Sequence, residues 1–345
     1  MLTILGLSIL SIVGLIGAFY MAWNIGANDL ANSMGDVVGA KVLNLKQVCI
    51  IGGIMNFLGV VFFGSRVTKT VGKGIVRTDL MMELDPHMAV LGAISALFAA
   101  GIWVSFATYK QLPVSTSHSM VGSMLGFGIA AASMGIIGFD DIGWTVLMKV
   151  AASWVLSPIA GMVLAFLIFN LIRHTFINRI KDTVKLEKLF GPLLIGSSCY
   201  QAFSFGSNDV ANAIGPVPII LGMGNLEIPL WLLAFGGIGI VIGLSTWGYK
   251  VIYTIGEKIT ELTPTRGFSA DVACATTVII CSSYGMPVST THVLVGCTIG
   301  VGLARGLEAV NLNVIRGIVY SWLVTVPISM VIAFTIYIGL VWLGI

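Results

Sequence analysis

The chain has 345 residues, of which 57% are hydrophobic and 10% are charged, and its net charge is +3 with a mean hydropathy of +0.99. Because an ordinary soluble domain carries about 25% charged residues, this composition excludes a water-soluble globular protein. The small net charge indicates no particular partner, and nucleic acid is not expected as one.

Six apolar stretches are long enough, at roughly 20 residues each, to cross a bilayer as helices. In chain order they are residues 2–20, 48–64, 88–108, 146–172, 228–251 and 315–343. The first has no basic leader and no cleavage site, so we interpret it as a retained span and not as a signal peptide. We expect an all-α polytopic membrane protein with roughly 10–12 transmembrane segments, some of them short or re-entrant.

Two peptides each occur twice, in the same order. The first, called here the Asn-Asp motif, reads GANDLANSMG at residues 26–35 and GSNDVANAIG at residues 206–215. The second, the Ser-Thr motif, reads PVSTSHSMVG at residues 113–122 and PVSTTHVLVG at residues 287–296. The similar interval between the motifs in each half predicts an internal duplication, which in secondary transporters often has inverted topology.

A basic segment lies between the two copies. Its cationic residues outnumber Asp182 and Glu187, and they are Arg173, Arg179, Lys181, Lys185 and Lys188. The positive-inside rule places such a loop in the cytoplasm. We therefore divide the chain into a first transmembrane repeat, 1–172, a cytoplasmic linker, 173–190, and a second repeat, 191–345. A patch that binds phosphate or lipid is the alternative interpretation of these charges.

The Asn-Asp motifs place carboxylates in apolar surroundings. Flanking glycines predict broken helices, which survive in a membrane only where they are buried in protein or line a wet cavity. Asp29 and Asn32, like Asp209 and Asn212, are three residues apart and therefore share a helix face. Carboxylate, amide and freed backbone oxygens suit Na+. A proton relay through the aspartates and a purely structural capping role are the alternatives.

The Ser-Thr motifs predict two helix starts. Pro113 and Pro287 can begin a helix at its first turn. The hydroxyls that follow lie beside unpaired backbone N–H groups, an arrangement that binds anions. Two such starts facing each other across a pseudo-twofold axis would surround a tetrahedral oxyanion, whereas simple N-capping is the plain alternative. The hydroxyl residues are Ser115, Thr116, Ser117, Ser289, Thr290 and Thr291.

Other charged and titratable residues lie near these motifs. His118 and His292 each follow a motif serine by three positions, so we expect them behind the ligand-contacting groups, where a structural role is the alternative. We interpret a further set as loop-solvated or ion-paired: Glu83, Asp85, Lys110, Asp271 and Arg305.

The paired GANDLAN and GSNDVAN segments, with PVSTSH and PVSTTH, resemble the inorganic phosphate transporter (PiT) family, whose members include Na+-coupled and H+-coupled phosphate carriers. The resemblance covers essentially the whole chain and favours the sodium/phosphate symporter branch. It implies an all-helical bundle of inverted repeats, with phosphate held between the halves, in a plasma-membrane carrier that is not an enzyme. The chain lacks the large central hydrophilic domain of animal members, so only transport is carried over.

The resemblance also implies site residues. Phosphate contacts fall on Ser115, Thr116, Ser289 and Thr290, with Asn28, Asp29, Asn208 and Asp209 close by, and the motif pattern adds Ser117 and Thr291. Na+ sites fall on Asn28, Asp29, Asn32, Asn208, Asp209 and Asn212. Apart from Na+ as the coupling ion, no cofactor is expected.

Charge makes a coupling cation necessary in this scheme. Phosphate is an anion, the site already contains two aspartates, and like charges in a low-dielectric core repel by several kcal/mol. We therefore predict Na+-coupled phosphate import. An H+-coupled phosphate or sulfate permease is the closest alternative, followed by a channel with a Ser-Thr filter. A hydrolase with a Ser115, His118 and Asp29 triad is disfavoured because the same set recurs in the other half. The sequence leaves a homodimer open.

Overall fold

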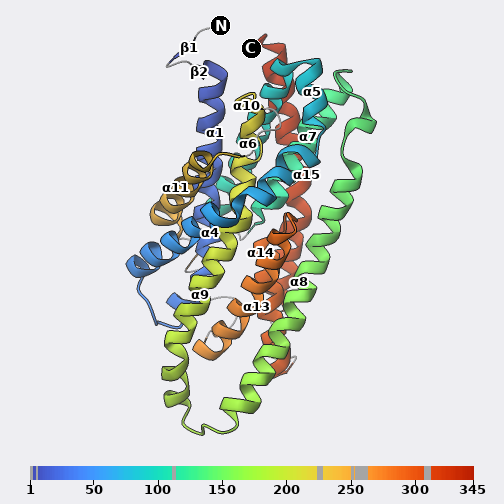
Figure 1. The fold of residues 1–345 in the computed structure, drawn as a ribbon. Coiled ribbons are helices and arrows are strands. Elements are labelled where there is room, and N and C mark those ends of the chain that lie inside the picture. The colour runs from blue at the N-terminus through green and yellow to red at the C-terminus, as the bar shows by residue number, and fades with distance from the viewer. Residues whose placement is uncertain are drawn as a thin grey trace.

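A computed structural model describes residues 3–4, 7–110, 114–223, 228–249, 252, 263–306 and 312–345, and it shows an elongated bundle of helices (Figure 1). Pro113 lies outside the described residues. The only strands in these ranges are β1 (Thr3–Ile4) and β2 (Leu7–Ser8), which pair antiparallel ahead of the first helix. The protein is therefore all-helical, as predicted.

The helices fall into two similar series. The first contains α1 (Ile9–Ile25), the π-helix η1 (Gly26–Leu30), α2 (Ala31–Ser33), α3 (Gly35–Gly39), α4 (Leu45–Gly74), α5 (Thr78–Leu84), α6 (Pro86–Tyr109), α7 (Thr116–Ser133), η2 (Phe139–Asp141), α8 (Trp144–Ile172) and η3 (Arg173–Ile177). The second contains α9 (Thr183–Ile214), α10 (Val217–Ile220), α11 (Leu230–Trp247), α13 (Pro264–Ser283), α14 (Thr290–Arg305) and α15 (Leu312–Trp342).

Six helical segments of the described chain are long and apolar enough to cross a membrane. They are Ile9–Ser33, Leu45–Gly72, Pro86–Tyr109, Trp144–Ile177, Leu230–Trp247 and Leu323–Trp342, and each overlaps one predicted stretch. The first begins later than predicted and continues into the Asn-Asp motif as far as Ser33. Its start is fixed by Ser8, whose Oγ accepts a hydrogen bond from the Ser11 backbone N–H at 3.1 Å and thereby caps α1.

The helices run in opposite directions in the two series (Figure 1). Helix α1 begins at the upper end of the bundle, close to the N-terminus, whereas α9 begins at the lower end. Helix α8 descends to that lower end over 29 residues, or about 43 Å, whereas α15 rises to the C-terminus at the upper end. Both chain ends thus lie opposite the segment that joins α8 to α9.

Helix α1 packs closely against α11 through glycines. A Cβ on Gly26 would lie 1.8 Å from the Ile240 carbonyl oxygen, and a Cβ on Gly243 would lie 1.9 Å from the Trp23 carbonyl oxygen. No side chain fits at either position, so glycine allows the two backbones to touch. Small residues serve the same purpose at other membrane helix interfaces.

Helix α9 packs against α4 through the equivalent pair. A Cβ on Gly206 would lie 2.1 Å from the Asn56 carbonyl oxygen, and a Cβ on Gly59 would lie 1.9 Å from that of Phe203. Gly206 occupies the motif position of Gly26, so the same interface is built twice. In each case a helix of one series packs on a helix of the other.

A second type of interface is also repeated. Helix α7 packs on α15 and α14 packs on α8. A Cβ on Gly126 would lie 2.1 Å from the Met330 carbonyl oxygen, and a Cβ on Gly300 would lie 2.1 Å from that of Met162. These glycines follow the two Ser-Thr motifs at the same spacing. The two series therefore interlock instead of forming separate bodies.

The expected helix break in the second Asn-Asp motif is wrong. The first motif is interrupted, as predicted, at Met34 between α2 and α3. In the second motif, helix α9 continues without interruption through Asn208 and Asp209 to Ile214. The physical reason is the role of the first motif glycine, which allows close helix packing at Gly206 and does not end the helix. The predicted breaks do occur at the Ser-Thr motifs, where α7 and α14 begin.

Candidate functional site

The four motifs meet in one buried cluster, and Asp29 lies at its centre. The Asp29 carboxylate accepts hydrogen bonds from the Thr116 hydroxyl and, at 3.0 Å, from Thr291 Oγ1. Thr116 belongs to the Ser-Thr motif of the same half and Thr291 to that of the other half. With 1% of its surface exposed, Asp29 depends on these hydroxyls in place of water.

Asp209 has the equivalent surroundings. Thr290 Oγ1 donates to its carboxylate oxygens at 3.1 and 3.3 Å. One turn further along α9, Asn212 Nδ2 donates to Ser117 Oγ at 3.0 Å and to Thr116 Oγ1 at 3.3 Å. The second Asn-Asp motif is thus joined to the Ser-Thr motifs of both halves.

The remaining asparagines extend the pattern. Asn32 Nδ2 donates to Thr291 Oγ1 at 3.3 Å, while Asn28 and Asn208 donate at 3.1 Å to Thr108 Oγ1 and Ser282 Oγ, respectively. Within the described ranges, the Oδ1 atoms of Asn32 and Asn208 are buried and accept no hydrogen bond. A buried amide oxygen without a donor is available to ligate a cation.

The two helix starts are capped in the same way. Ser115 and Ser289 are the N-caps of α7 and α14, and their Oγ atoms accept from the backbone N–H of His118 at 3.2 Å and of His292 at 3.3 Å. The capping interpretation therefore holds for these two serines. The other N–H groups of the first turn have no carbonyl acceptor within their own helix, and the next hydroxyls in each motif point into the cluster.

A direct hydrogen bond joins the two helix starts. Ser117 Oγ donates to the Val288 carbonyl oxygen at 3.0 Å, and Thr291 Oγ1, which donates to Asp29, lies 3.5 Å from the Val114 carbonyl oxygen. The side chains predicted to contact phosphate are at most 2% exposed. Positive ends of two helix dipoles, hydroxyl donors and two carboxylates are therefore concentrated in one enclosed region.

The two histidines lie behind the helix starts, against each other. Their ring centroids are 4.2 Å apart, and the His118 ring lies 3.7 Å from that of Trp154. Both are at most 4% exposed. Ser115 Oγ is engaged by the backbone N–H of His118, an arrangement that serves helix capping and not nucleophile activation.

A second pair of carboxylates was missed by sequence reasoning. Asp271, interpreted above as loop-solvated or ion-paired, is 1% exposed within α13, so that interpretation is wrong. Its carboxylate accepts from Ser198 Oγ at 2.6 Å and Ser197 Oγ at 3.0 Å, and it contacts the carboxyl group of Asp36. The available signal was the absence of Asp, Glu, Lys and Arg between Asp271 and Arg305, which is typical of a segment buried in a membrane protein.

Comparison with known proteins agrees with this geometry. The model of the phosphate transporter family matches residues 25–333. A predicted phosphate permease of Thermococcus kodakarensis is 39% identical, and the alignment covers 93% of this chain and 95% of that protein. The chloroplastic inorganic phosphate transporter 2-1 of Arabidopsis thaliana is 36% identical over 94% of this chain and 71% of its own length.

A solved structure is similar over nearly the whole chain. It is titled the sodium-dependent phosphate transporter, and it matches with a TM-score of 0.89 and 37% identity over 97% of this chain and 100% of that chain. The protein described here therefore belongs to the phosphate transporter family and is a multi-pass membrane protein that transports phosphate and is not an enzyme.

Proposed function

We propose that this transporter imports inorganic phosphate by symport with Na+, and that the anion binds where the four motifs meet. The observation that carries the proposal is the hydrogen bonding of Asp29 to Thr116 and Thr291, because it puts carboxylates and helix-start hydroxyls of both halves within one site. The name of the similar solved structure supports Na+ as the coupling ion.

The cluster suggests how a cation would control anion binding. A threonine hydroxyl has one proton and two lone pairs. While Thr290 and Thr291 donate to Asp209 and Asp29, their protons face the carboxylates and are not available to phosphate. Na+ bound to a carboxylate would accept the hydroxyl lone pairs as ligands, so that the proton could turn to the anion. The same ion would neutralise the negative charge that repels phosphate.

The proposed cation ligands are the Asn-Asp residues. The buried amide oxygens of Asn32 and Asn208 support this assignment, as they accept no hydrogen bond within the described part of the chain. The full set is Asn28, Asp29, Asn32, Asn208, Asp209 and Asn212. Phosphate would be held by Ser117, Thr116, Thr290 and Thr291, by the first-turn N–H groups of α7 and α14, and by Ser115 and Ser289 at the caps.

We propose that the two repeats, 1–172 and 191–345, have inverted topology and are joined by the linker 173–190. The repeated glycine interfaces and the opposite directions of α1 and α9 support this arrangement. Among the described residues each half has five helices of at least 16 residues, and an odd number of crossings reverses the next repeat. With shorter segments added, this agrees with roughly 10–12 membrane segments.

The orientation follows from charge. The linker carries more lysine and arginine than acidic residues, so we place it in the cytoplasm and both termini outside, in the plasma membrane. Substrate import would then carry phosphate from the end of the bundle that holds the termini to the end that holds the linker.

Transport by the purified protein in liposomes tests the proposal. An inward Na+ gradient should drive phosphate uptake, and replacement of Na+ by K+ or choline at fixed pH should abolish it. Undiminished uptake without Na+ would contradict Na+ coupling, and uptake driven by a pH gradient alone would identify an H+-coupled carrier. Competition by sulfate at the same concentrations would show whether the site selects phosphate.

A further inference from the structure

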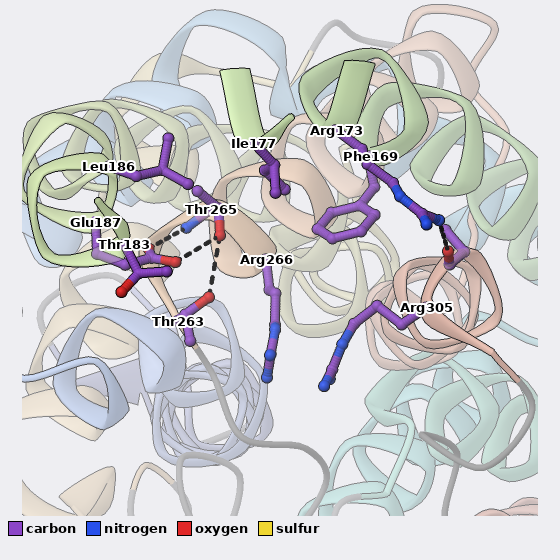
Figure 2. A pocket seen from close by; sticks show the side chains of 11 residues that line it. Phe169, Arg173, Ile177, Thr183, Leu186, Glu187, Thr263, Thr265, Arg266 and Arg305 are labelled. Atoms are coloured by element: carbon purple, nitrogen blue, oxygen red, sulfur yellow. Dashed lines mark hydrogen bonds between the residues drawn. The ribbon is translucent and has the colours of Figure 1, made fainter. Parts of the chain in front are cut away.

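A cavity of about 330 Å3 lies at the linker end of the bundle, apart from the four motifs (Figure 2). Its walls come from the end of α8, from η3, from the starts of α9 and α13, and from the end of α14. Both halves of the chain therefore build it. Helix α14 connects it with the central cluster, since the helix begins at Thr290 and reaches Arg305 after 16 residues, or about 24 Å.

Three arginines line this cavity, called here the arginine pocket. Arg173 follows α8, Arg266 lies in the first turn of α13 and Arg305 is the last residue of α14. Figure 2 shows the Arg266 and Arg305 side chains extending in the same direction, whereas the Arg173 side chain turns the other way. Among the described residues that line the pocket, three are arginines and one, Glu187, is acidic.

The Glu187 carboxylate is already engaged elsewhere. It accepts from the Thr265 backbone N–H and from Thr265 Oγ1, each at 3.0 Å, and so it satisfies the start of α13. Within the ranges that the structure describes, neither Arg173 nor Arg305 forms an ion pair with a carboxylate. Glu187 therefore does not neutralise Arg173 or Arg305.

The pocket also has a fixed geometry. Arg173 Nη1 donates to the Ala304 carbonyl oxygen at 3.2 Å, which ties the end of α8 to the end of α14 (Figure 2). Phe169 and Leu186 form an apolar wall, and each is at most 4% exposed.

We propose that the arginine pocket is a second anion site, which binds a phosphate group at the linker end. Guanidinium groups match phosphate oxygens with parallel hydrogen bonds, and arginines from different helices that line one cavity are typical of such recognition. The phosphate group can come from inorganic phosphate that has left the central cluster or from the headgroup of an anionic phospholipid. The proposal does not depend on which ion drives transport.

Binding by the purified full-length protein tests this site. Equilibrium binding of radiolabelled inorganic phosphate in Na+ should reveal a weaker site in addition to the central one. The paired substitution of Arg266→Gln and Arg305→Gln should weaken that site about tenfold or more while leaving the central one intact. In a second arm, thermal unfolding is followed with added phosphatidic acid or phosphatidylcholine, and the same variant should lose any stabilisation that is specific to phosphatidic acid.

The control removes two other positive charges of the same segment. Lys181→Gln with Lys188→Gln changes exposed side chains outside the pocket and should leave both arms as in wild type. A loss confined to the phosphate arm identifies free phosphate as the occupant, and a loss confined to the lipid arm identifies a headgroup. An arginine variant that matches wild type in both arms, or a lysine variant that loses as much, overturns the proposal. If the double variant fails to fold, Arg305→Gln alone carries the test, since Arg305 is exposed at a helix end.

Discussion

Thr291 Oγ1 donates a 3.0 Å hydrogen bond to Asp29, although 262 positions separate the two residues in the chain. The bond joins the Ser-Thr motif of one half to the Asn-Asp motif of the other. Because the Thr291 hydroxyl contacts the Asp29 carboxylate directly, neutralising that carboxylate would weaken the hydrogen bond from Thr291. In the proposed scheme, coupling between cation and anion therefore requires no long-range movement, because the proposed cation and anion ligands are hydrogen-bonded to each other.

The aspartates themselves are the first test of this scheme. Asp29→Asn and Asp209→Asn preserve side-chain size but remove the negative charge that would attract Na+. We expect the Na+ concentration needed for half-maximal phosphate binding to rise roughly tenfold or more in each variant. Phosphate binding to the purified variants is measured across a Na+ series. If both variants kept the Na+ dependence of wild type, the cation sites would lie elsewhere.

The bridging hydroxyl gives a second prediction. Thr291→Val keeps the shape of the side chain but removes the donor to Asp29, so phosphate binding in saturating Na+ should weaken roughly tenfold or more. The matched control is Thr298→Val on the same helix, because Thr298 Oγ1 donates to the Leu294 carbonyl of its own helix at 2.9 Å and bonds to no other described residue. Uptake of radiolabelled phosphate and equilibrium phosphate binding should both be weaker in Thr291→Val than in Thr298→Val. Equal behaviour would assign Thr291 no role in the anion site.

A third prediction concerns the first glycine of the Asn-Asp motif. Gly206→Ala would place a Cβ 2.1 Å from the Asn56 carbonyl oxygen, so α9 and α4 must move apart. Overpacking of this kind costs about 1–3 kcal/mol, and the unfolding temperature in detergent should fall. Gly196→Ala lies on the same helix with no atom within 4 Å of the added Cβ, so it should leave the unfolding temperature unchanged or slightly higher. An unaffected Gly206→Ala variant would contradict the close contact.

The membrane spans and the convergence of the motifs were predictable from the sequence. Long apolar stretches specify spans, because only a helix satisfies its backbone in lipid. The recurrence of Asn-Asp and Ser-Thr motifs indicated one composite site, and the structure does bring Asp29, Thr116 and Thr291 together. Repetition supplied this information, since equivalent residues must occupy equivalent places.

What the sequence could not supply was the partner of each residue. The sequence contains Gly206, but it does not show whether this glycine ends a helix or allows another helix to pack closely. In the structure the close packing of α4 shows that Gly206 has the second role. Asp271 was misinterpreted for the same reason. Its contact with Asp36 spans the two halves, and no local pattern around either residue encodes that pairing.

The Asp36–Asp271 pair leads to the final prediction. In Asp271→Asn the amide oxygen can still accept from Ser197 and Ser198, and its NH2 group can donate to Asp36 Oδ2, which accepts no hydrogen bond within the described residues. Replacing one of two adjoining carboxylates by a donor removes their repulsion, so the unfolding temperature in detergent should stay the same or rise.

Asp271→Leu should behave differently, because it leaves the two serine hydroxyls without their carboxylate acceptor, at a cost of about 1–3 kcal/mol. Its unfolding temperature should therefore fall below those of wild type and Asp271→Asn. Asp140→Leu provides the control, since it removes an exposed carboxylate from η2 at the other end of the molecule and should have little effect. A fall in Asp271→Asn as large as in Asp271→Leu would show that the negative charge itself is required, which would mean that Asp271 balances a positive charge instead of opposing Asp36.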